Sequence, residues 1–424
     1  MKKLVSLLLA LAMVLSLSAV SFAQDDANTL TVWCWDPAFN LYAMEEAAKV
    51  YQETNPDFTL NIVETPWDDI QTALTTAGMA GSVDTLPDIY LMQDNAFQKN
   101  ALTFPDQLID LTDSGIDFSQ FGKAKVDYSV VNGKNFGVPF DNGAGVHAIR
   151  TDILEEAGYT VADVTDITWD RYLEIGRDVL AKTGKPMQSG TSGGPDLVMM
   201  MLQSAGASLF DAEGNPQIAN NPALVKVLEI FSTMIKEGIY IETTGWDGYI
   251  SSFINGNVAG TMNGCWILAS VQTAKDQSGK WAVTNLPSLP GIEGATNYSN
   301  NGGSSWAVSS NCKNKELAFD FLAKTFAGSV PFYETILPAS GALATYLPAG
   351  SSDVYSKPHE FFGGEPVFST ITEFAGKIPS NNTGVYYYEA RDAVGVAMTE
   401  IVGGKPIEDA LSDAQMTVEF NMGI

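Results

Sequence analysis

The chain contains 424 residues, of which 23 are basic and 50 acidic, so its formal net charge is -27. Hydrophobic residues make up 45% and aromatic residues 10%, which excludes a disordered chain, and the negative charge excludes a nucleic-acid partner and an anionic membrane surface. A chain of this length exceeds one hydrophobic core, so we expect two domains.

Residues 1–23 have the pattern of a secretory signal peptide. Two lysines precede an apolar run over 4–20, and Ser21-Phe22-Ala23 places small residues at the two positions that a signal peptidase recognises. The alternative is a membrane anchor, but the run is short and a polar, acidic segment follows at once. Because no lipobox precedes Cys34, we expect no lipid anchor and predict a periplasmic protein, with secretion into the medium as the alternative.

The front third of the chain alternates strand and helix patterns. We expect strands at 30–35, 59–63 and 87–91, with helices at 41–54 and 67–79 between them. This alternation predicts a parallel sheet with right-handed crossovers. The Gly-punctuated segment 131–140 predicts a hairpin that leads into an extended crossing strand.

A second unit begins at Asp141. Thr168 and Asn221 are predicted to cap two of its helices, and the second cap is followed by proline at the first helical position. The segment 291–305 is rich in Gly, Asn and Ser, which is typical of a loop or hinge. We expect further strands at 148–150, 258–262 and 281–290, and helices at 151–157, 315–326, 386–401 and 406–416.

The first strand ends in an unusual mixture of side chains: Trp35, Asp36, Phe39 and Asn40. Ligands of open α/β sheets bind beyond the carboxyl ends of the strands, so we expect these side chains at a ligand site. Flat apolar rings beside hydrogen-bonding groups suit a sugar, whose C–H faces are apolar and whose hydroxyls are polar. For Asn40 alone, the alternative is a helix N-cap.

The chain resembles the family 1 extracellular solute-binding proteins, which are the sugar receptors of ABC importers. Within that family the resemblance is to the maltose-binding-protein type. The resemblance covers nearly the whole chain after the signal peptide. It rests on the order and spacing of the segments 30–53, 87–95, 136–154, 258–266 and 314–322. It implies an α/β fold of two lobes joined by hinge strands, with the ligand between them. It also implies discontinuous lobes, the N-terminal one of residues 24–138 plus 303–332 and the C-terminal one of residues 139–302 plus 333–424.

The resemblance suggests further ligand-binding residues. Its members place carboxylates and amides where Gln93, Asp94 and Asn95 stand, for which the alternative is loop solvation. They place stacking rings at Trp266 and Tyr387. We add three residues from the sequence itself: Trp67, whose alternative is helix-start packing, Trp246, and Asn301, whose alternative is turn chemistry.

No catalytic or metal-binding set is evident in the sequence. His147 and His359 are its two histidines, and they lack the spacing of a metal site or a catalytic triad. The three cysteines are expected to be buried thiols, although a Cys34–Cys265 bridge is conceivable. We therefore expect a binding protein that is not an enzyme and needs neither metal nor cofactor.

The predicted function is a monomeric receptor that captures an oligosaccharide between its lobes and delivers it to the transmembrane subunits of an ABC permease. The opening segment 33–40 is similar to that of receptors for arabino- or xylo-oligosaccharides. The alternatives are a secreted carbohydrate-active enzyme, a receptor for a non-sugar solute, and a sugar sensor that serves a chemoreceptor.

Overall fold

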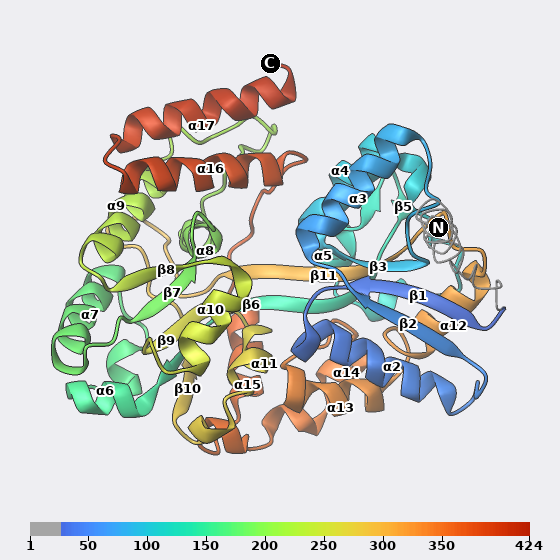
Figure 1. The fold of residues 1–424 in the computed structure, drawn as a ribbon, viewed down its shortest axis with the longest axis horizontal. Helices are drawn as coiled ribbons and strands as arrows, with labels where there is room; N and C mark the ends of the chain where they lie inside the picture. Colours follow the sequence, from blue (N-terminus) through green and yellow to red (C-terminus); the bar gives the residue numbers. More distant parts are fainter. Residues whose placement is uncertain (1–26) are drawn as a thin grey trace, which may run out of the picture.

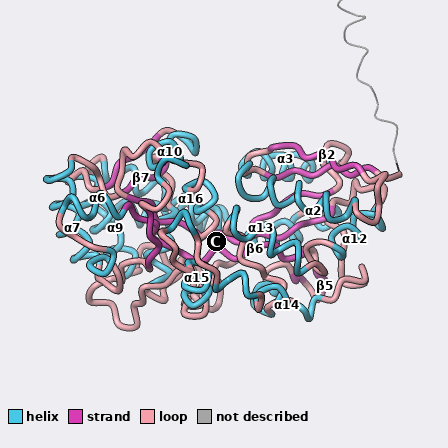
Figure 2. Tube along the Cα trace, turned by 90° about the horizontal axis from the view of Figure 1, so that it is seen from below, coloured by secondary structure: helices cyan, strands magenta, loops and turns pink. Residues whose placement is uncertain are grey.

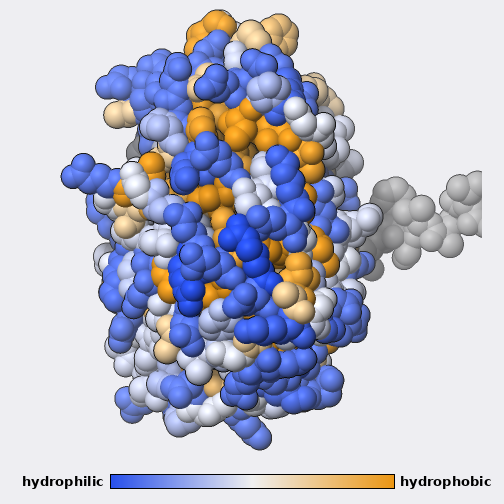
Figure 3. Space-filling view, turned by 90° about the vertical axis from the view of Figure 1, so that its left-hand side faces the viewer, coloured by the Kyte–Doolittle hydropathy of each residue, from blue (hydrophilic) through white to orange (hydrophobic). Residues whose placement is uncertain are grey.

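The computed structural model describes residues 27–424, so the predicted signal peptide lies outside the described residues. Two lobes of strands covered by helices lie at the two ends of the molecule, and two long strands cross the middle between them (Figures 1 and 2). Within residues 27–424 no helix is long and apolar enough to span a membrane. The outer end of the second lobe is largely hydrophilic, with an apolar patch in its upper half (Figure 3).

A seven-stranded sheet runs through both lobes in the order β10-β6-β11-β3-β1-β2, with β9 paired to β6. Its strands are β1 (Thr29–Cys34), β2 (Thr59–Glu64), β3 (Ile89–Gln93), β6 (Val138–Arg150), β9 (Gly260–Gly264), β10 (Trp281–Thr284) and β11 (Asn300–Val308). β1 pairs in parallel with β2 and with β3, which confirms the parallel sheet expected for the front of the chain.

The first lobe is built by the alternation of side chains along its strands. Ile89 and Leu91 of β3 enter one core cluster, and Tyr90 and Met92 enter another on the opposite face. Helix α2 (Tyr42–Gln52) covers the first face and α3 (Trp67–Ala80) the second. The remaining elements are α4 (Phe97–Thr103), α5 (Lys123–Asp127), the hairpin β4 (Val130–Val131) and β5 (Lys134–Asn135), and α12 (Lys315–Lys324).

The crossing strands are β6 and β11. β6 is 13 residues long, and its first half pairs with β11 while its second half pairs with β9 and β10. At the crossing, a Cβ added to Gly143 would lie 2.1 Å from the backbone oxygen of Asn301, so the two backbones need glycine there. The ladder between β6 and β11 is also irregular between Asn300 and Gly303. One strand therefore belongs to both lobes and joins them at the crossing.

The second lobe contains a pair of strands that the sequence did not reveal, β7 (Gln188–Thr191) and β8 (Tyr240–Thr243), which pair in parallel. Thr168 and Asn221 accept hydrogen bonds at the starts of α7 (Trp169–Thr183) and α9 (Pro222–Lys236), which confirms both caps. Its other helices are α6 (Thr151–Ala157), α8 (Asp196–Ser204), α10 (Gly245–Ile254), α11 (Ile267–Val271), α16 (Tyr387–Val402) and α17 (Ile407–Met422). Helices α9, α16 and α17 share one core cluster, and α16 and α17 lie side by side (Figure 1).

From the expected lobe boundary at 332/333 onward, the chain makes three helices that sequence analysis did not place: α13 (Val330–Ser340), which straddles the boundary, α14 (Leu347–Gly350) and α15 (Val367–Ala375). Tyr333 and Ile336 of α13 belong to the same core cluster as Met44 of α2, so α13 packs on the first lobe. α15 belongs instead to the cluster that contains Val146 and Ala148 of β6. The three cysteines are free and buried, so Cys34 and Cys265 do not pair.

Candidate functional site

The candidate site lies where the carboxyl ends of strands from both lobes meet. In the first lobe, β1 is followed by Trp35, β2 leads to Trp67, and β3 ends at Gln93. In the second lobe, β7 ends at Thr191, and β9 is followed closely by Trp266. The amino-terminal end of α16 points from the second lobe toward α3 and α4 of the first (Figure 1).

The turn after β1 is held by its own polar side chains. The Asp36 carboxylate accepts from the backbone nitrogens of Ala38 and Phe39 at 2.9 and 3.1 Å, so Asp36 is the helix cap. Asn40 Oδ1 accepts from the nitrogens of Trp35 and Asp36, at 2.9 Å each, and the alternative of Asn40 as the cap is wrong. Burial raises the pKa of Asp36 to about 6, against the effect of its two backbone hydrogen bonds.

Of the other side chains after β1, Phe39 lies in the core and Trp35 does not. The Phe39 ring packs on that of Phe140, 5.4 Å away, and is 5% exposed. Trp35 is half-buried, so part of its surface is free to contact a ligand. The turn after β1 therefore presents Trp35, while Asp36, Phe39 and Asn40 hold the chain in place.

A first aromatic group, formed by Trp35, Trp67 and Tyr388, joins the two lobes. The ring centroids of Trp35 and Trp67 are 5.6 Å apart, and those of Trp67 and Tyr388 are 6.1 Å apart. Tyr388 lies on α16 beside Tyr387, whose ring is 5.3 Å away in an edge-on arrangement. These three rings and that of Tyr387 are half-buried, so ring surface is presented from both lobes.

The three polar residues at the end of β3 have different environments. Gln93 Oε1 accepts a hydrogen bond from the Tyr388 hydroxyl, and Asn95 is half-buried. Asp94 is buried and forms an ion pair with Lys125, which also donates to the backbone oxygen of Ser304 at 2.9 Å. Burial raises the pKa of Asp94 to about 6, although Lys125 opposes the shift. Asp94 therefore serves first as an internal partner of Lys125 beside the crossing strands.

The second aromatic group, Trp246 and Trp266, stands in the second lobe. Their ring centroids are 5.7 Å apart, and Trp246 is 39% exposed. Trp266 Nε1 donates to the backbone oxygen of Asn301 at 2.9 Å, and Asn301 Nδ2 donates to Asn263 Oδ1 at 2.6 Å. These bonds tie the second aromatic group to β11 at the crossing, so Trp246, Trp266 and Asn301 are brought together.

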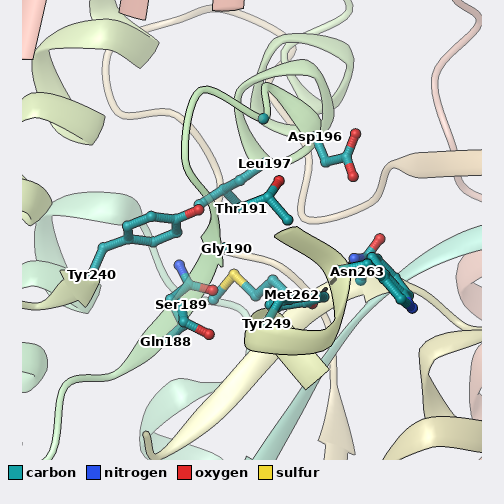
Figure 4. A pocket seen from close by; sticks show the side chains of 12 residues that line it. Gln188, Ser189, Gly190, Thr191, Asp196, Leu197, Tyr240, Tyr249, Met262 and Asn263 are labelled. Carbon is teal, nitrogen blue, oxygen red and sulfur yellow. Dashed lines mark hydrogen bonds between the residues drawn. The ribbon is translucent and has the colours of Figure 1, made fainter. Parts of the chain in front are cut away.

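A small pocket beside Trp246 contains residues that sequence analysis missed. We call it the Trp246 pocket, and it is lined by Gln188, Thr191, Asp196, Tyr240, Asn263 and others (Figure 4). Asp196 Oδ1 accepts from Arg391 of α16 at 2.6 Å, which links the pocket to the helix that carries Tyr387 and Tyr388. The signal that could have found these residues is the Gly-rich loop 192–195 before α8, but the polar strand β7 in front of it shows no hydrophobic alternation.

The chemistry of these side chains is that of recognition. Rings, amides and one carboxylate surround the site, and within residues 27–424 no three His, Cys, Asp or Glu lie close enough together to hold a metal ion. His147 is buried against Tyr172, with ring centroids 5.7 Å apart, and burial lowers its pKa to about 3. His147 is thus a neutral core residue.

Comparisons with known proteins agree with this description. A family model described as bacterial extracellular solute-binding protein matches residues 46–334. The chain is 40% identical over 385 residues to a lactose-binding protein from Rhizobium radiobacter, and the match covers 91% of both chains. It is 26% identical over 392 residues to an arabinooligosaccharide-binding protein from Halalkalibacterium halodurans, over 89% of this chain and 86% of that relative.

Solved structures show the same fold. The ABC transporter associated binding protein from B. animalis subsp. lactis Bl-04, in complex with β-1,6-galactobiose, superposes with a TM-score of 0.81 at 20% identity, over 93% of this chain and 98% of that one. The galacto-N-biose-/lacto-N-biose I-binding protein from Bifidobacterium longum, in complex with lacto-N-biose, gives 0.74 at 19% identity, over 95% and 99%. The expected two-lobed α/β fold is confirmed.

Proposed function

The chain belongs to the bacterial extracellular solute-binding proteins, and from this premise we propose that it captures an oligosaccharide between its lobes and presents it to an ABC permease. The observation that carries the proposal is that aromatic rings from both lobes, Trp35 with Trp67 and Trp246 with Trp266, lie beside amide and carboxylate side chains. Such rings stack on the C–H faces of a sugar, while amides and carboxylates bind its hydroxyl groups.

We propose two roles for the predicted site residues. Those with free surface contact the sugar: Trp35, Trp67, Gln93, Asn95, Trp246, Trp266, Asn301 and Tyr387. Those that are buried and bonded inside the protein position the others: Asp36, Phe39, Asn40 and Asp94. In the second role, the Asp36 carboxylate fixes the turn that presents Trp35, and Asp94 holds Lys125 beside the crossing strands.

Binding is proposed to work by hinge closure about β6 and β11. We propose the lobe boundaries expected from the sequence, with one change. Helix α13 is assigned to the first lobe and moves with it, because α13 packs on α2. Contacts between the lobes include the Tyr388–Gln93 hydrogen bond and an ion pair between Lys99 and Glu389. These contacts exist only when the lobes are close, so the structure corresponds to a closed form.

Sugar is favoured over other solutes by the similarity to named sugar receptors and by the composition of the site. A lactose-binding protein is 40% identical to this chain, whereas an arabinooligosaccharide-binding protein is 26% identical, so a hexose ligand is the better proposal and a pentose oligomer the second. We also propose that the protein leaves its ligand unchanged and that it acts in the periplasm or outside the cell.

A thermal-shift and calorimetric screen tests the proposal. The mature protein is mixed with lactose, maltose, cellobiose, xylobiose and arabinobiose, and with spermidine and a tripeptide as non-sugar controls. A ligand at about 100 times its Kd stabilises the fold by about 2.7 kcal/mol, so a sugar should raise the melting temperature. A shift with spermidine or peptide but with no sugar would refute the sugar proposal, and sugar breakdown on long incubation would show an enzyme.

A further inference from the structure

The Trp246 pocket has features that the proposed function does not use. It is lined by β7 along its length, by Tyr240, the first residue of β8, and by Trp246 of α10, the helix that follows β8. Its open space is about 20 Å³, which is room for one water-sized group. The pocket is therefore too small for a sugar ring but large enough for a single hydroxyl group.

The pocket offers polar groups that lack partners in the protein. Gln188 is 1% exposed, and its Nε2 has no hydrogen-bond partner within residues 27–424. The Thr191 hydroxyl also makes no hydrogen bond to the described residues. By contrast, the neighbouring Ser189 hydroxyl is bonded to that of Ser252. A buried amide donor without a partner is unfavourable, so the pocket is suited to a ligand group that accepts and donates hydrogen bonds.

The surroundings of the pocket show how a sugar would approach it. Trp246 lines the pocket and is 39% exposed, with its ring supported by Trp266 and by Tyr249, whose centroid is 5.3 Å away. Thr191, Asp196 and Asn263 lie on one side of the pocket, while Tyr240 and Gln188 lie on the other (Figure 4). A sugar ring resting on Trp246 thus has the polar pocket at its edge.

We propose that the Trp246 pocket receives the hydroxymethyl group of a hexopyranose, so that this receptor selects hexose over xylose oligosaccharides. The inference rests on the proposed sugar binding and adds to it which class of sugar is selected. A hydroxyl on a one-carbon arm reaches into a space that the ring itself cannot enter, whereas xylopyranose has no such arm. The Thr191 hydroxyl and the Gln188 amide then obtain the partner that they lack.

Matched ligands test this inference. Lactose is compared by calorimetry with 6-deoxylactose and 6′-deoxylactose, which lack one hydroxyl each, and cellobiose is compared with xylobiose, which lacks both hydroxymethyl groups. If lactose does not bind, maltose and its two C6-deoxy analogues replace it. A site built to bond one hydroxyl should bind one of the deoxy analogues about tenfold or more weakly, and cellobiose should bind more tightly than xylobiose.

Matched variants identify the pocket as the cause. Thr191→Val removes only the hydroxyl, and Gln188→Met removes the amide at nearly constant shape. Each variant should bind the hexose ligand more weakly than the wild type does. Its affinity for the deoxy analogue that binds weakly to the wild type should be unchanged. Ser192→Ala is the control, because Ser192 directly follows Thr191, is exposed and does not line the pocket, and it should change neither affinity.

The outcomes separate the two proposals. Equal affinity for the parent sugar and both deoxy analogues, or tightest binding of a xylose oligomer, would overturn the specificity while leaving sugar binding intact. The specificity would also be overturned if the deoxy analogue lost as much affinity relative to its parent sugar in both pocket variants as in the wild type, since the hydroxyl would then bind elsewhere. No binding of any sugar would refute the proposed function itself.

Discussion

Tyr388 on α16 of the second lobe donates its hydroxyl hydrogen to Oε1 of Gln93, the last residue of β3 in the first lobe. These residues are 295 positions apart in the chain, and the bond joins the lobes across the candidate site. The same helix end also pairs Glu389 with Lys99 of α4. The amino-terminal end of α16 therefore fastens the lobes together.

Tyr388→Phe should shift the protein toward an open form and weaken sugar binding. The lost hydrogen bond contributes about 1 kcal/mol to closure, which corresponds to about fivefold in Kd. Calorimetry measures the affinity, and small-angle scattering should show a larger radius for the unliganded variant. Tyr386→Phe is the matched control, because the Tyr386 ring packs on the second-lobe core and its hydroxyl makes no hydrogen bond within residues 27–424. Equal behaviour of the two variants would contradict the fastening role.

Trp266→Ala should lower both sugar affinity and stability. Trp266 packs against two core clusters and bonds to Asn301, so its removal should cost about 2 kcal/mol or more of unfolding free energy. As a ring in the site it should also weaken binding about thirtyfold. Titration and apo melting together measure the two effects, and Trp266→Phe should restore part of each. Normal affinity in a variant that melts far lower would show that Trp266 is a core residue alone.

Gly143→Ala should destabilise the crossing of β6 and β11. The added Cβ would lie 2.1 Å from the backbone oxygen of Asn301, and overpacking of this kind costs about 1–3 kcal/mol. Gly122→Ala is the control, since a Cβ at Gly122 meets nothing within 4 Å and its φ of -60° suits alanine. Thermal melting of the unliganded proteins compares them. An unchanged melting temperature for Gly143→Ala would mean that the crossing strands are not closely packed there.

The raised pKa of Asp36 predicts a pH dependence of stability. Burial raises this pKa from 3.8 to about 6, so between these values the folded protein holds a proton that the unfolded chain has lost. This group therefore stabilises the fold fully below pH 3.8, and its contribution is lost as the pH rises through about 6. Asp36→Asn keeps the oxygen that accepts from Ala38 and Phe39 and removes the titration.

The difference in melting temperature between wild type and Asp36→Asn isolates this effect from the other carboxylates. Relative to Asp36→Asn, the wild type should lose stability as the pH rises from 4 to 7. A constant difference in melting temperature between wild type and Asp36→Asn across this pH range would show that the pKa of the Asp36 carboxyl is not raised.

The parts of the fold that sequence analysis predicted are those with strong local patterns. The alternation in Leu30, Val32 and Cys34, and the caps at Thr168 and Asn221, are properties of neighbouring residues. β7, with the sequence Gln-Ser-Gly-Thr, has no apolar alternation, because it is short and its neighbours supply the burial. Without β7 there was no strand end to point to Thr191 and Asp196.

In the candidate site, too, local patterns were predictable from the sequence and long-range contacts were not. Trp35 and Gln93 were predicted because they follow buried strands, but the burial of Phe39 depends on Phe140, a residue on another strand. The ion pair of Asp94 with Lys125 joins residues 31 positions apart, and no local pattern reveals it. Long-range contacts thus decide which polar or aromatic residue after a strand keeps free surface at the candidate site and which one supports the turn.

The central claim, that a sugar is held between the lobes, is tested most directly by one calorimetric comparison. Wild type is titrated with lactose, or with the tightest-binding sugar of the panel, beside Trp67→Ala in the first lobe and Trp246→Ala in the second. Ring anchors typically contribute about 2 kcal/mol or more, so each variant should bind at least about tenfold more weakly than wild type, whose stoichiometry should be one sugar per chain. Loss of affinity in only one of the two variants, each shown by melting to be folded, would contradict capture between the lobes.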